Sequence, residues 1–324
     1  MEKILVTGGA GYVGSCLISR LLNKGYEVIC IDKLMFGGEA LLNFCHDPKF
    51  TFYNVDLLDF EKVDDIFKSN KIDAVFHLAA IVGDPACKAE PELATKVNLD
   101  ASKFLLDSAI RYQVSKFIFA STCSNYGKAE GYVDESNELA PVSLYAELKV
   151  AFERYLMEKK TEDYNFTPTV LRFATVYGLS PRMRFDLTVN EFTKALANEE
   201  ELVIYGEQFW RPYCHVRDFA NAFTLVLESK PESVSYEVFN VGDTQENYTK
   251  KMLADELLKA IPEANISYVD KKEDPRDYRV NCDKIKSQLG FKITKTVPQG
   301  IAEILSVIRS EVVSNTEDKK YYNT

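Results

Sequence analysis

Apolar runs alternate with amphipathic stretches along the first half of the chain. The runs are rich in β-branched and aromatic residues, which is typical of strands, and the stretches between them predict helices. The predicted strands are 3–8, 26–32, 50–56, 72–80 and 115–122, and the predicted helices lie at about 14–24, 60–68 and 91–112. Near-continuous apolar strands separated by helices indicate a parallel sheet covered on both faces. With right-handed crossovers the fold class is α/β, a doubly wound parallel (Rossmann) sheet.

The second half continues the pattern and then becomes less regular after Leu179. The further predictions are a helix at 145–160, a strand at 168–178, a helix at 187–198, strands at 236–242 and 265–269, a charged loop at 270–278, and helices at 249–260, 281–288 and 298–311. We expect residues 1–178 and 213–243 to form the Rossmann domain. A smaller C-terminal lobe, 179–212 and 244–312, should cover the carboxyl ends of the strands, where ligands bind in open α/β sheets. The polar tail 313–324 is expected to be flexible.

Composition and charge exclude several classes of protein. The chain has 324 residues, of which 46% are hydrophobic and 27% are charged, as in ordinary globular proteins. Lys and Arg number 39 against 49 Asp and Glu, and a net charge of -10 argues against binding to nucleic acid. No apolar run is long enough to span a bilayer, and the chain enters a strand with no signal-peptide pattern. Seven Cys without a C-x-x-C pair and only three His predict neither disulfides nor a metal site, so we expect a cytoplasmic protein.

A glycine-rich turn, TGGAGYVG at residues 7–14, joins the first predicted strand to the first predicted helix. Gly8, Gly11 and Gly14 permit a tight turn and let the backbone approach a pyrophosphate. The helix that follows offers free N–H groups and the positive end of its dipole. A glycine turn alone is a weak signal, but the position between a strand and a helix is the context that dinucleotide binding requires.

The second strand ends in an acidic residue, Asp32, eighteen residues after Gly14. A carboxylate there accepts hydrogen bonds from the adenosine ribose and repels a 2′-phosphate, which predicts NAD rather than NADP. Lys33 tempers this prediction, because a neighbouring cation partly neutralises a 2′-phosphate. Asp56 and Leu57 follow the third strand and are placed to meet the adenine, although a strand-end turn explains Asp56 equally well.

Tyr145 and Lys149 begin a predicted helix, and their i, i+4 spacing places the phenol and the ammonium on one helix face. A tyrosine is a poor base at neutral pH, but a nearby ammonium and a positive nicotinamide both favour the phenolate. Such a pair can accept a proton from a sugar hydroxyl. In isolation the spacing is common by chance, and its value comes from its place after the glycine turn and the fifth strand.

Hydroxyl and thiol side chains follow the fifth strand in the segment SKFIFASTCSNYG. Thr122 is placed to bond the reacting sugar oxygen and to align it with Tyr145. The alternative for Thr122 is capping of the strand end, which Ser and Thr often do. A nucleophilic role for Cys123 is disfavoured because no His neighbours it in the sequence.

These motifs, in this order, resemble the extended short-chain dehydrogenase/reductase superfamily, and within it the NAD-dependent nucleotide-sugar epimerase/dehydratase family. The resemblance covers about residues 2 to 312. It is carried by TGGAGYVG, Asp32, Asp56, HLAA (77–80), VNLDAS (97–102), STCSNYG (121–127), Tyr145 with Lys149, LRFATVYG (171–178), RPYCHVRD (211–218) and DPRDY (274–278).

The resemblance implies a role for each matching residue. Thr122, Tyr145 and Lys149 would be catalytic. NAD would be held by Gly8, Gly11, Tyr12, Val13, Gly14, Asp32, Lys33, Asp56, Leu57, Leu78, Ala79, Ala80, Asn98, Tyr145, Lys149 and Phe173. The nucleotide-diphosphate sugar would be held by Cys123, Ser124, Thr175, Arg182, Asn190, Arg211 and Arg276. An acidic protein needs local cations to bind a diphosphate, and the guanidinium of Arg binds it with two parallel N–H donors. For any one of these arginines taken alone, a surface salt bridge is the simpler interpretation.

Departures from the family pattern narrow the expected reaction. The 4,6-dehydratases of the family carry Asp-Glu after the catalytic Thr, and here those positions are Cys123 and Ser124, which argues against dehydration. Many epimerases have Asn where this chain has Thr175. The block FATVYGLSPRMRFDLTVNEF (173–192) resembles a subgroup that acts on nucleotide-linked sugars of surface polysaccharides and includes GDP-heptose 4-dehydrogenases. Its Arg182 and Arg184 either select a hydroxyl or pair with nearby acids such as Asp186, and the sequence leaves that choice open.

The resemblance therefore predicts oxidation at carbon 4 of a nucleotide-diphosphate sugar through a 4-keto intermediate, most often in a 4-epimerase of surface polysaccharide biosynthesis. A net 4-dehydrogenase and a 4-ketoreductase use the same first residues and stay open. A non-catalytic NAD-binding protein is the least favoured alternative, because Tyr145 and Lys149 are both present. The family also implies a homodimer that buries the helices at 91–112 and 145–160.

Overall fold

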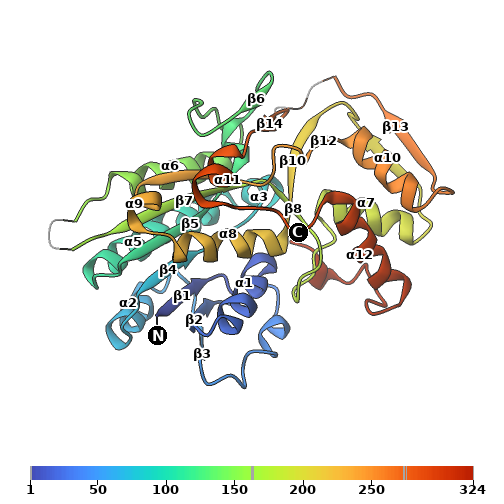
Figure 1. Ribbon diagram of the computed structural model, residues 1–324. Coiled ribbons are helices and arrows are strands. Elements are labelled where there is room, and N and C mark those ends of the chain that lie inside the picture. The colour runs from blue at the N-terminus through green and yellow to red at the C-terminus, as the bar shows by residue number, and fades with distance from the viewer. Residues whose placement is uncertain (1, 162–163, 273, 275, 324) are drawn as a thin grey trace.

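The computed structural model describes residues 2–161, 164–272, 274 and 276–323. A seven-stranded parallel sheet lies between two layers of helices, and a second lobe stands beside it (Figure 1). The sheet order is β11-β7-β5-β4-β1-β2-β3. The strands of the chain are β1 (Lys3–Thr7), β2 (Glu27–Asp32), β3 (Phe50–Asn54), β4 (Ala74–His77), β5 (Lys116–Thr122), β6 (Tyr132–Val133), β7 (Thr167–Phe173), β8 (Thr175–Tyr177), β9 (Leu202–Tyr205), β10 (Trp210–His215), β11 (Glu237–Val241), β12 (Asn247–Thr249), β13 (Ile266–Val269) and β14 (Arg279–Val280). The predicted α/β fold is confirmed.

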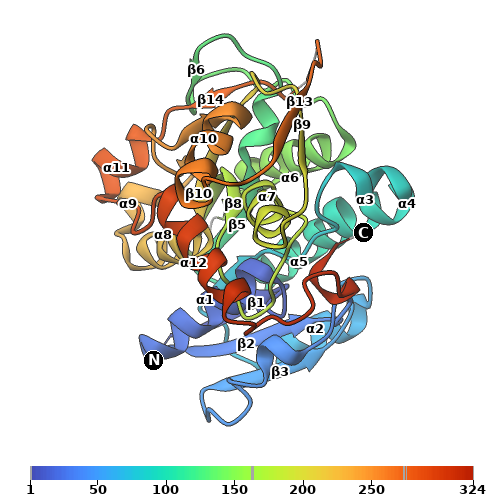
Figure 2. The same cartoon turned by 90° about the vertical axis from the view of Figure 1, so that its right-hand side faces the viewer.

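Helices cover both faces of this sheet (Figures 1 and 2). The helices of both lobes are α1 (Tyr12–Asn23), α2 (Phe60–Ser69), α3 (Asp84–Ala89), α4 (Pro91–Thr95), α5 (Ser102–Arg111), α6 (Leu144–Glu158), α7 (Thr188–Ala197), α8 (Val216–Glu228), α9 (Pro231–Val234), α10 (Lys250–Ala260), α11 (Asp283–Leu289) and α12 (Val297–Arg309), with the short helical turns η1 (Glu39–Leu41), η2 (Lys96–Ala101), η3 (Cys123–Tyr126) and η4 (Lys319–Tyr321). Among the described residues, no helix is long and apolar enough to cross a membrane.

Successive side chains of each strand alternate between the two faces of the sheet, and this explains why the main domain has two hydrophobic cores. Ile4 and Val6 of β1 pack with α1 and α8, whereas Leu5 between them packs with α2, α5 and α6. Successive side chains of a strand point to opposite faces, so a strand that is apolar throughout needs a helical layer on each side. The helices supply these layers, and the carboxyl ends of the strands stay free to form a site.

The second lobe has a core of its own, built mainly by α7, α10 and α12. β9 pairs with β13, and β10 lies between β8 and β12. Figure 2 shows α7, α10 and α12 grouped above α1 and β1. Part of the segment predicted for this lobe returns to the main domain instead, because Ile285 of α11 and Phe291 are buried against the core formed by α1 and α8.

Two elements predicted as continuous are divided in the structure. The strand at 168–178 becomes β7 and β8, because Ala174 N donates to Val241 O and the chain then leaves the main sheet to pair with β10. The helix at 91–112 becomes α4, the π-helical turn η2 and α5. The amide of Asn98 bonds both the N–H and the carbonyl of Ile81, at 2.8 and 2.9 Å, and the π turn places it there.

The tail, which the sequence predicts to be flexible, packs against the second lobe. Thr316 is 7% exposed, and Val313, Tyr321 and Tyr322 pack on the core of that lobe. The two tyrosine rings give the polar tail enough apolar surface to dock. Residue 324 of the predicted tail, and residues 273 and 275 of the predicted loop 270–278, lie outside the described residues.

Candidate active site

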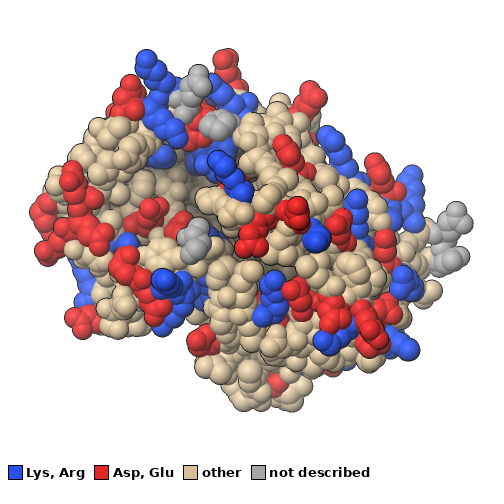
Figure 3. Space-filling model, turned by 180° about the vertical axis from the view of Figure 1, so that it is seen from behind, with Lys and Arg blue, Asp and Glu red and all other residues tan. Residues whose placement is uncertain are grey.

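A cavity of about 720 Å³ opens at the carboxyl ends of the central strands and extends to the second lobe. Figure 3 shows it as a hollow with Lys and Arg side chains gathered above it. The predicted site residues that line it are Gly8, Gly11, Tyr12, Val13, Gly14, Asp32, Lys33, Asp56, Leu57, Leu78, Ala79, Ala80, Thr122, Ser124, Tyr145, Lys149, Phe173, Thr175, Arg182, Arg211 and Arg276. Three others do not line it: Asn98, Cys123 and Asn190.

The glycine turn is packed too closely to admit side chains at two of its positions. A Cβ at Gly14 would lie 2.2 Å from the carbonyl oxygen of Gly8, and Gly8 itself has a φ of 72°. Gly11 is the N-cap residue of α1 and has no side chain to cap the helix, so the first N–H groups of the helix stay available on the cavity side. Backbone donors at a helix N-terminus fit a pyrophosphate, and the turn therefore suits a dinucleotide.

The carboxylate of Asp32 is fixed at the end of β2. Its oxygens accept hydrogen bonds from Ala10 N at 3.0 Å and Leu34 N at 2.8 Å, and burial raises the pKa of this carboxyl. Lys33 Nζ lies 3.1 Å from Asp56 Oδ2. The ammonium of Lys33, which in the sequence weakened the prediction of NAD over NADP, is therefore already paired with a carboxylate. The pocket edge thus presents a fixed acid to a ribose, which favours NAD over NADP.

Replacing Asp32 with Ala should weaken NAD binding by about ten-fold or more, because hydrogen bonds to a charged group contribute about 1.5–3 kcal/mol. The preference for NAD over NADP should shrink as well, since the repulsion of a 2′-phosphate is removed. Calorimetric titration with both cofactors measures this. Asp65→Ala on the exposed side of α2 is the matched control. Unchanged affinity for NAD in Asp32→Ala would remove Asp32 from the cofactor site.

Tyr145 and Lys149 lie on one face of α6, whose first turn is capped by Ser143 through a bond from Ala146 N at 3.4 Å. Lys149 Nζ donates to the Ala120 carbonyl at 2.8 Å and lies 5.8 Å from the centre of the Tyr145 ring. Burial lowers the pKa of Lys149 to about 8. Burial also raises the pKa of Tyr145, so Tyr145 is a phenol until positive charge in the site favours its ionised form.

Thr122 ends β5 and combines two features. Its Oγ1 accepts a hydrogen bond from Ser124 N and donates one to Ser124 Oγ, both at 3.1 Å. Thr122 therefore caps the turn η3, which is the alternative role considered for it from the sequence. Thr122 also borders the cavity that Tyr145 lines. The cap holds its hydroxyl in a fixed position at the cavity wall.

A buried ion pair supports this wall from behind. Glu153, one turn after Lys149, accepts hydrogen bonds from Arg172 Nη2 at 2.8 Å, Asn125 Nδ2 at 2.7 Å and Ser121 Oγ. Glu153 and Arg172 are 4% and 6% exposed. Sequence reasoning missed Glu153, although its i+4 spacing from Lys149 places both on one helix face. The pair ties α6 to β7 and to the end of β5, which carries Thr122.

Replacing Glu153 with Ala should lower the free energy of unfolding by about 3–5 kcal/mol, because it leaves the Arg172 guanidinium buried without its carboxylate. Urea denaturation followed by circular dichroism measures this change. Glu158→Ala, at the exposed end of the same helix, should alter the midpoint far less. Equal midpoints for both variants would show that the pair contributes nothing to folding.

Arginines form the wall contributed by the second lobe. Arg211 pairs with Asp274 at 2.9 Å, and Arg276 pairs with Asp84 at 2.9 Å. Arg184 holds Asp186 through two bonds, at 2.8 and 2.6 Å. Arg182 pairs with no carboxylate in the part of the chain that the structure describes. The pairing of Arg184 with Asp186 is one of the two alternatives that the sequence left open, whereas Asp274 and Asp84 come from distant parts of the chain and were not foreseen.

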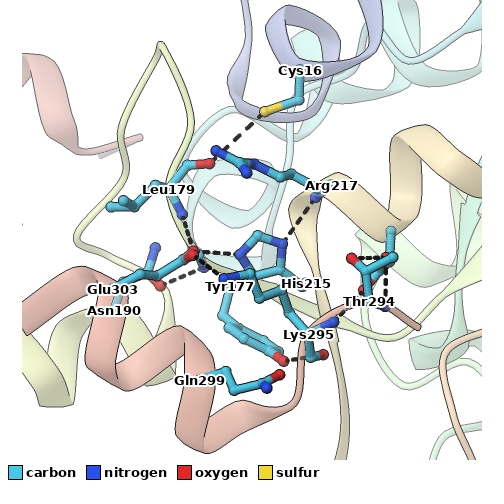
Figure 4. A network of polar contacts seen from close by, with 12 residues as sticks. Cys16, Tyr177, Leu179, Asn190, His215, Arg217, Thr294, Lys295, Gln299 and Glu303 are labelled. Atoms are coloured by element: carbon cyan, nitrogen blue, oxygen red, sulfur yellow. Dashed lines mark hydrogen bonds and ion pairs between the residues drawn. The ribbon is translucent and has the colours of Figure 1, made fainter. Parts of the chain in front are cut away.

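A polar network fixes the loop that carries Arg182 (Figure 4). Glu303 of α12 accepts a hydrogen bond from Leu179 N at 3.2 Å and contacts His215 Nε2 at 2.5 Å. Gly178 must be glycine here, because its φ is 105° and a Cβ would lie 2.1 Å from the His215 ring. The loop after β8 is therefore anchored on both lobes.

The three predicted site residues outside the cavity have other partners. Asn98 bonds the backbone of Ile81, and Cys123, fully buried, donates its thiol to the Arg172 carbonyl at 3.2 Å. Asn190 accepts a bond from Gly178 N at 2.9 Å and donates to the Arg184 carbonyl at 2.8 Å. The predictions of direct contact for Cys123 and Asn190 are thus not supported, because their polar atoms point into the protein.

Comparison with known proteins finds related sequences and related folds. The family model "NAD dependent epimerase/dehydratase family" matches residues 4–242. A UDP-glucose 4-epimerase of Bacillus subtilis is 31% identical over 259 residues, which are 74% of this chain and 76% of that protein. A dTDP-glucose 4,6-dehydratase of Actinoplanes is 30% identical over 324 residues, 95% of this chain and 98% of that protein. The solved structure of a UDP-glucose 4-epimerase with UDP-glucose from Thermotoga maritima has a TM-score of 0.84 at 30% identity, over 96% of this chain and 99% of that one.

Proposed function

The chain belongs to the NAD-dependent epimerase/dehydratase family, and from this premise we propose that it is a 4-epimerase of a nucleotide-diphosphate sugar that works through a 4-keto intermediate. The observation that carries the proposal is one shared cavity. It joins the dinucleotide turn and Asp32 to Thr122, Tyr145 and Lys149, with arginines on the opposite wall. A hexose linked to UDP is the first substrate class to test, because the similar epimerases are named for UDP-glucose.

Each residue has a defined task in this proposal. NAD+, when bound, supplies the hydride acceptor and a positive ring near Tyr145. Lys149 keeps positive charge beside the phenol, so that Tyr145 can take the proton from the hydroxyl at carbon 4. Thr122 turns its one hydroxyl hydrogen from Ser124 Oγ to the same oxygen and so holds that oxygen in line. Arg211 and Arg276 bind the diphosphate, which leaves the sugar end over Tyr145.

Two observations bear on the alternative reactions. The residues that follow Thr122 are Cys123, whose thiol is buried, and Ser124, so no acidic side chain directly follows Thr122 to remove a hydroxyl from carbon 6. We therefore favour epimerisation over 4,6-dehydration, although similar proteins include dehydratases. A net 4-dehydrogenase or 4-ketoreductase would use the same Tyr145 and Lys149, and a role in surface polysaccharide synthesis stays a prediction.

One assay separates these reactions. The purified protein is incubated with NAD+ and a panel of UDP-, GDP-, dTDP- and CDP-sugars, nicotinamide absorbance is followed, and products are identified by NMR. A carbon-4 epimer without net NADH supports the proposal. NADH that accumulates one for one with a 4-keto sugar makes the protein a dehydrogenase, and a keto product that has lost water makes it a dehydratase.

We also propose that the chain forms a homodimer in the cytoplasm, as the resemblance implies. The helices that would meet are α5 and α6, and Phe104 of α5 and Tyr155 of α6 are both only partly buried in the single chain. Sedimentation equilibrium tests the dimer, and a monomer at all concentrations would exclude it.

A further inference from the structure

The C-terminal segment, residues 313–323, runs back from α12 to the cavity. The segment lies along residues 182–186, of which Arg182, Arg184 and Asp186 line the cavity. Phe185 N donates to the Tyr321 carbonyl at 3.0 Å, and the two rings meet edge to face at 5.4 Å. The C-terminal segment and residues 182–186 are thus joined by a backbone hydrogen bond and by an aromatic contact.

The start of the C-terminal segment is anchored on α7. Asn198 Nδ2 donates to Thr316 Oγ1 at 3.0 Å, and Lys194 forms an ion pair with Glu317. Lys194 is 8% exposed and Thr316 is 7% exposed, whereas their partners Glu317 and Asn198 are exposed, so both contacts lie at the edge of the buried surface. Contacts of this kind contribute little energy, but together they define where the segment begins to follow α7.

The end of the segment reaches the cavity itself. Asn323 lines it, and its backbone N–H donates to Asp186 Oδ2 at 3.2 Å. Asp186 is also the partner of Arg184, so one carboxylate joins the segment to an arginine of the cavity wall. Arg182 Nη2 donates to the carbonyl of Tyr322 at 3.3 Å. The segment therefore contacts Arg182 directly and is joined to Arg184 through Asp186.

Two polar atoms at this junction have no hydrogen-bond partner among the described residues. They are Arg182 Nε, a donor, and Asn323 Oδ1, an acceptor. Arg182 is 7% exposed and its guanidinium lies 4.5 Å from the centre of the Phe36 ring. A buried polar atom without a partner costs about 1–3 kcal/mol. A sugar hydroxyl can satisfy both, since it donates and accepts, whereas a phosphate oxygen can satisfy only the arginine.

We propose that Asn323 is a specificity-determining residue, which the C-terminal segment holds beside Arg182 so that the two bind a hydroxyl of the glycosyl group. This inference rests on the proposed function, since it needs a nucleotide sugar in the cavity. In this inference Arg211 and Arg276 bind the nucleoside diphosphate, and the C-terminal segment helps to determine which sugar is accepted.

The test compares nucleotide sugars with the diphosphates that lack the sugar. NAD-loaded protein is titrated calorimetrically with UDP and UDP-glucose, GDP and GDP-mannose, dTDP and dTDP-glucose, and CDP and CDP-glucose. Asn323→Ala keeps the backbone N–H to Asp186, so the segment stays docked. It should weaken binding of the preferred nucleotide sugar about three- to ten-fold, the worth of one hydrogen bond, and leave the matching diphosphate unchanged. Deletion of residues 314–324 should weaken sugar binding further.

Lys319→Ala, in the same segment and exposed, is the matched control and should bind like the wild type. Thermal melting shows whether each variant is folded. Equal affinity of Asn323→Ala and wild type for every nucleotide sugar overturns the inference, and so does an equal loss for the sugar and its diphosphate. If the wild type binds a nucleotide sugar no more tightly than its diphosphate, the inference alone is overturned. The proposed function fails only if the product assay shows no reaction with any nucleotide sugar, so the two failures are distinguishable.

Discussion

Replacing Tyr145 with Phe should lower kcat by about a hundred- to ten-thousand-fold, the usual contribution of a positioned general base. The change removes only the phenol oxygen and leaves the ring on α6, so the cavity keeps its shape. NAD affinity should change little, because the glycine turn and Asp32 hold the adenosine and the pyrophosphate. Initial rates with the substrate identified by the panel, together with calorimetric titration of NAD, measure both quantities.

The control for this variant lies on the same helix. Tyr155→Phe removes a hydroxyl that bonds Asp107 at 2.7 Å, away from the cavity, and should leave kcat near the wild-type value. A Tyr145→Phe enzyme with wild-type turnover would refute the proposed mechanism. A loss of turnover accompanied by an equal loss of NAD affinity would make Tyr145 a binding residue only.

Replacing Lys149 with Met should lower kcat by a similar factor and should also change the pH profile. Burial lowers the pKa of Lys149 to about 8, so the wild type loses the ammonium above that pH and its kcat/KM should fall there. Without the ammonium, Tyr145 ionises less readily at every pH. The alkaline limb near pH 8 should therefore disappear in Lys149→Met, and the remaining rate should rise with pH. Rates between pH 6 and 10 test this directly.

Stability gives an independent check on the same group. The folded pKa of Lys149 lies below its ordinary value of 10.5, so the unfolded chain binds more protons between about pH 8 and 10.5. The contribution of this group to stability is therefore unfavourable below about pH 8 and disappears as the pH rises to 10.5. Lys149→Met should melt at or above the wild-type temperature at pH 7. A lower melting temperature, with an unchanged pH profile, would make Lys149 a structural residue rather than an electrostatic partner of Tyr145.

The sequence determined the parts of this protein that depend on short-range patterns. The spacing of apolar residues and their β-branched and aromatic composition predicted the parallel strands. The glycine-rich turn between the first strand and the first helix predicted a dinucleotide site. The i, i+4 spacing alone predicts that Tyr145 and Lys149 share one helix face. These features are local, since each depends on a few neighbouring residues and on backbone geometry that is the same in every protein.

Only the tertiary structure decided which distant residues meet. Arg276 is paired with Asp84, 192 positions away, and no spacing rule relates two such residues. Cys123 and Ser124 are neighbours in sequence, but the thiol of Cys123 is buried against Arg172 while Ser124 borders the cavity. The polar composition of residues 313–324 predicted a flexible tail. The surface on which Thr316 and Tyr321 pack is assembled from elements far apart in the sequence, so no local pattern could predict that contact. Long-range packing sets these contacts, and it acts only once the whole chain has folded.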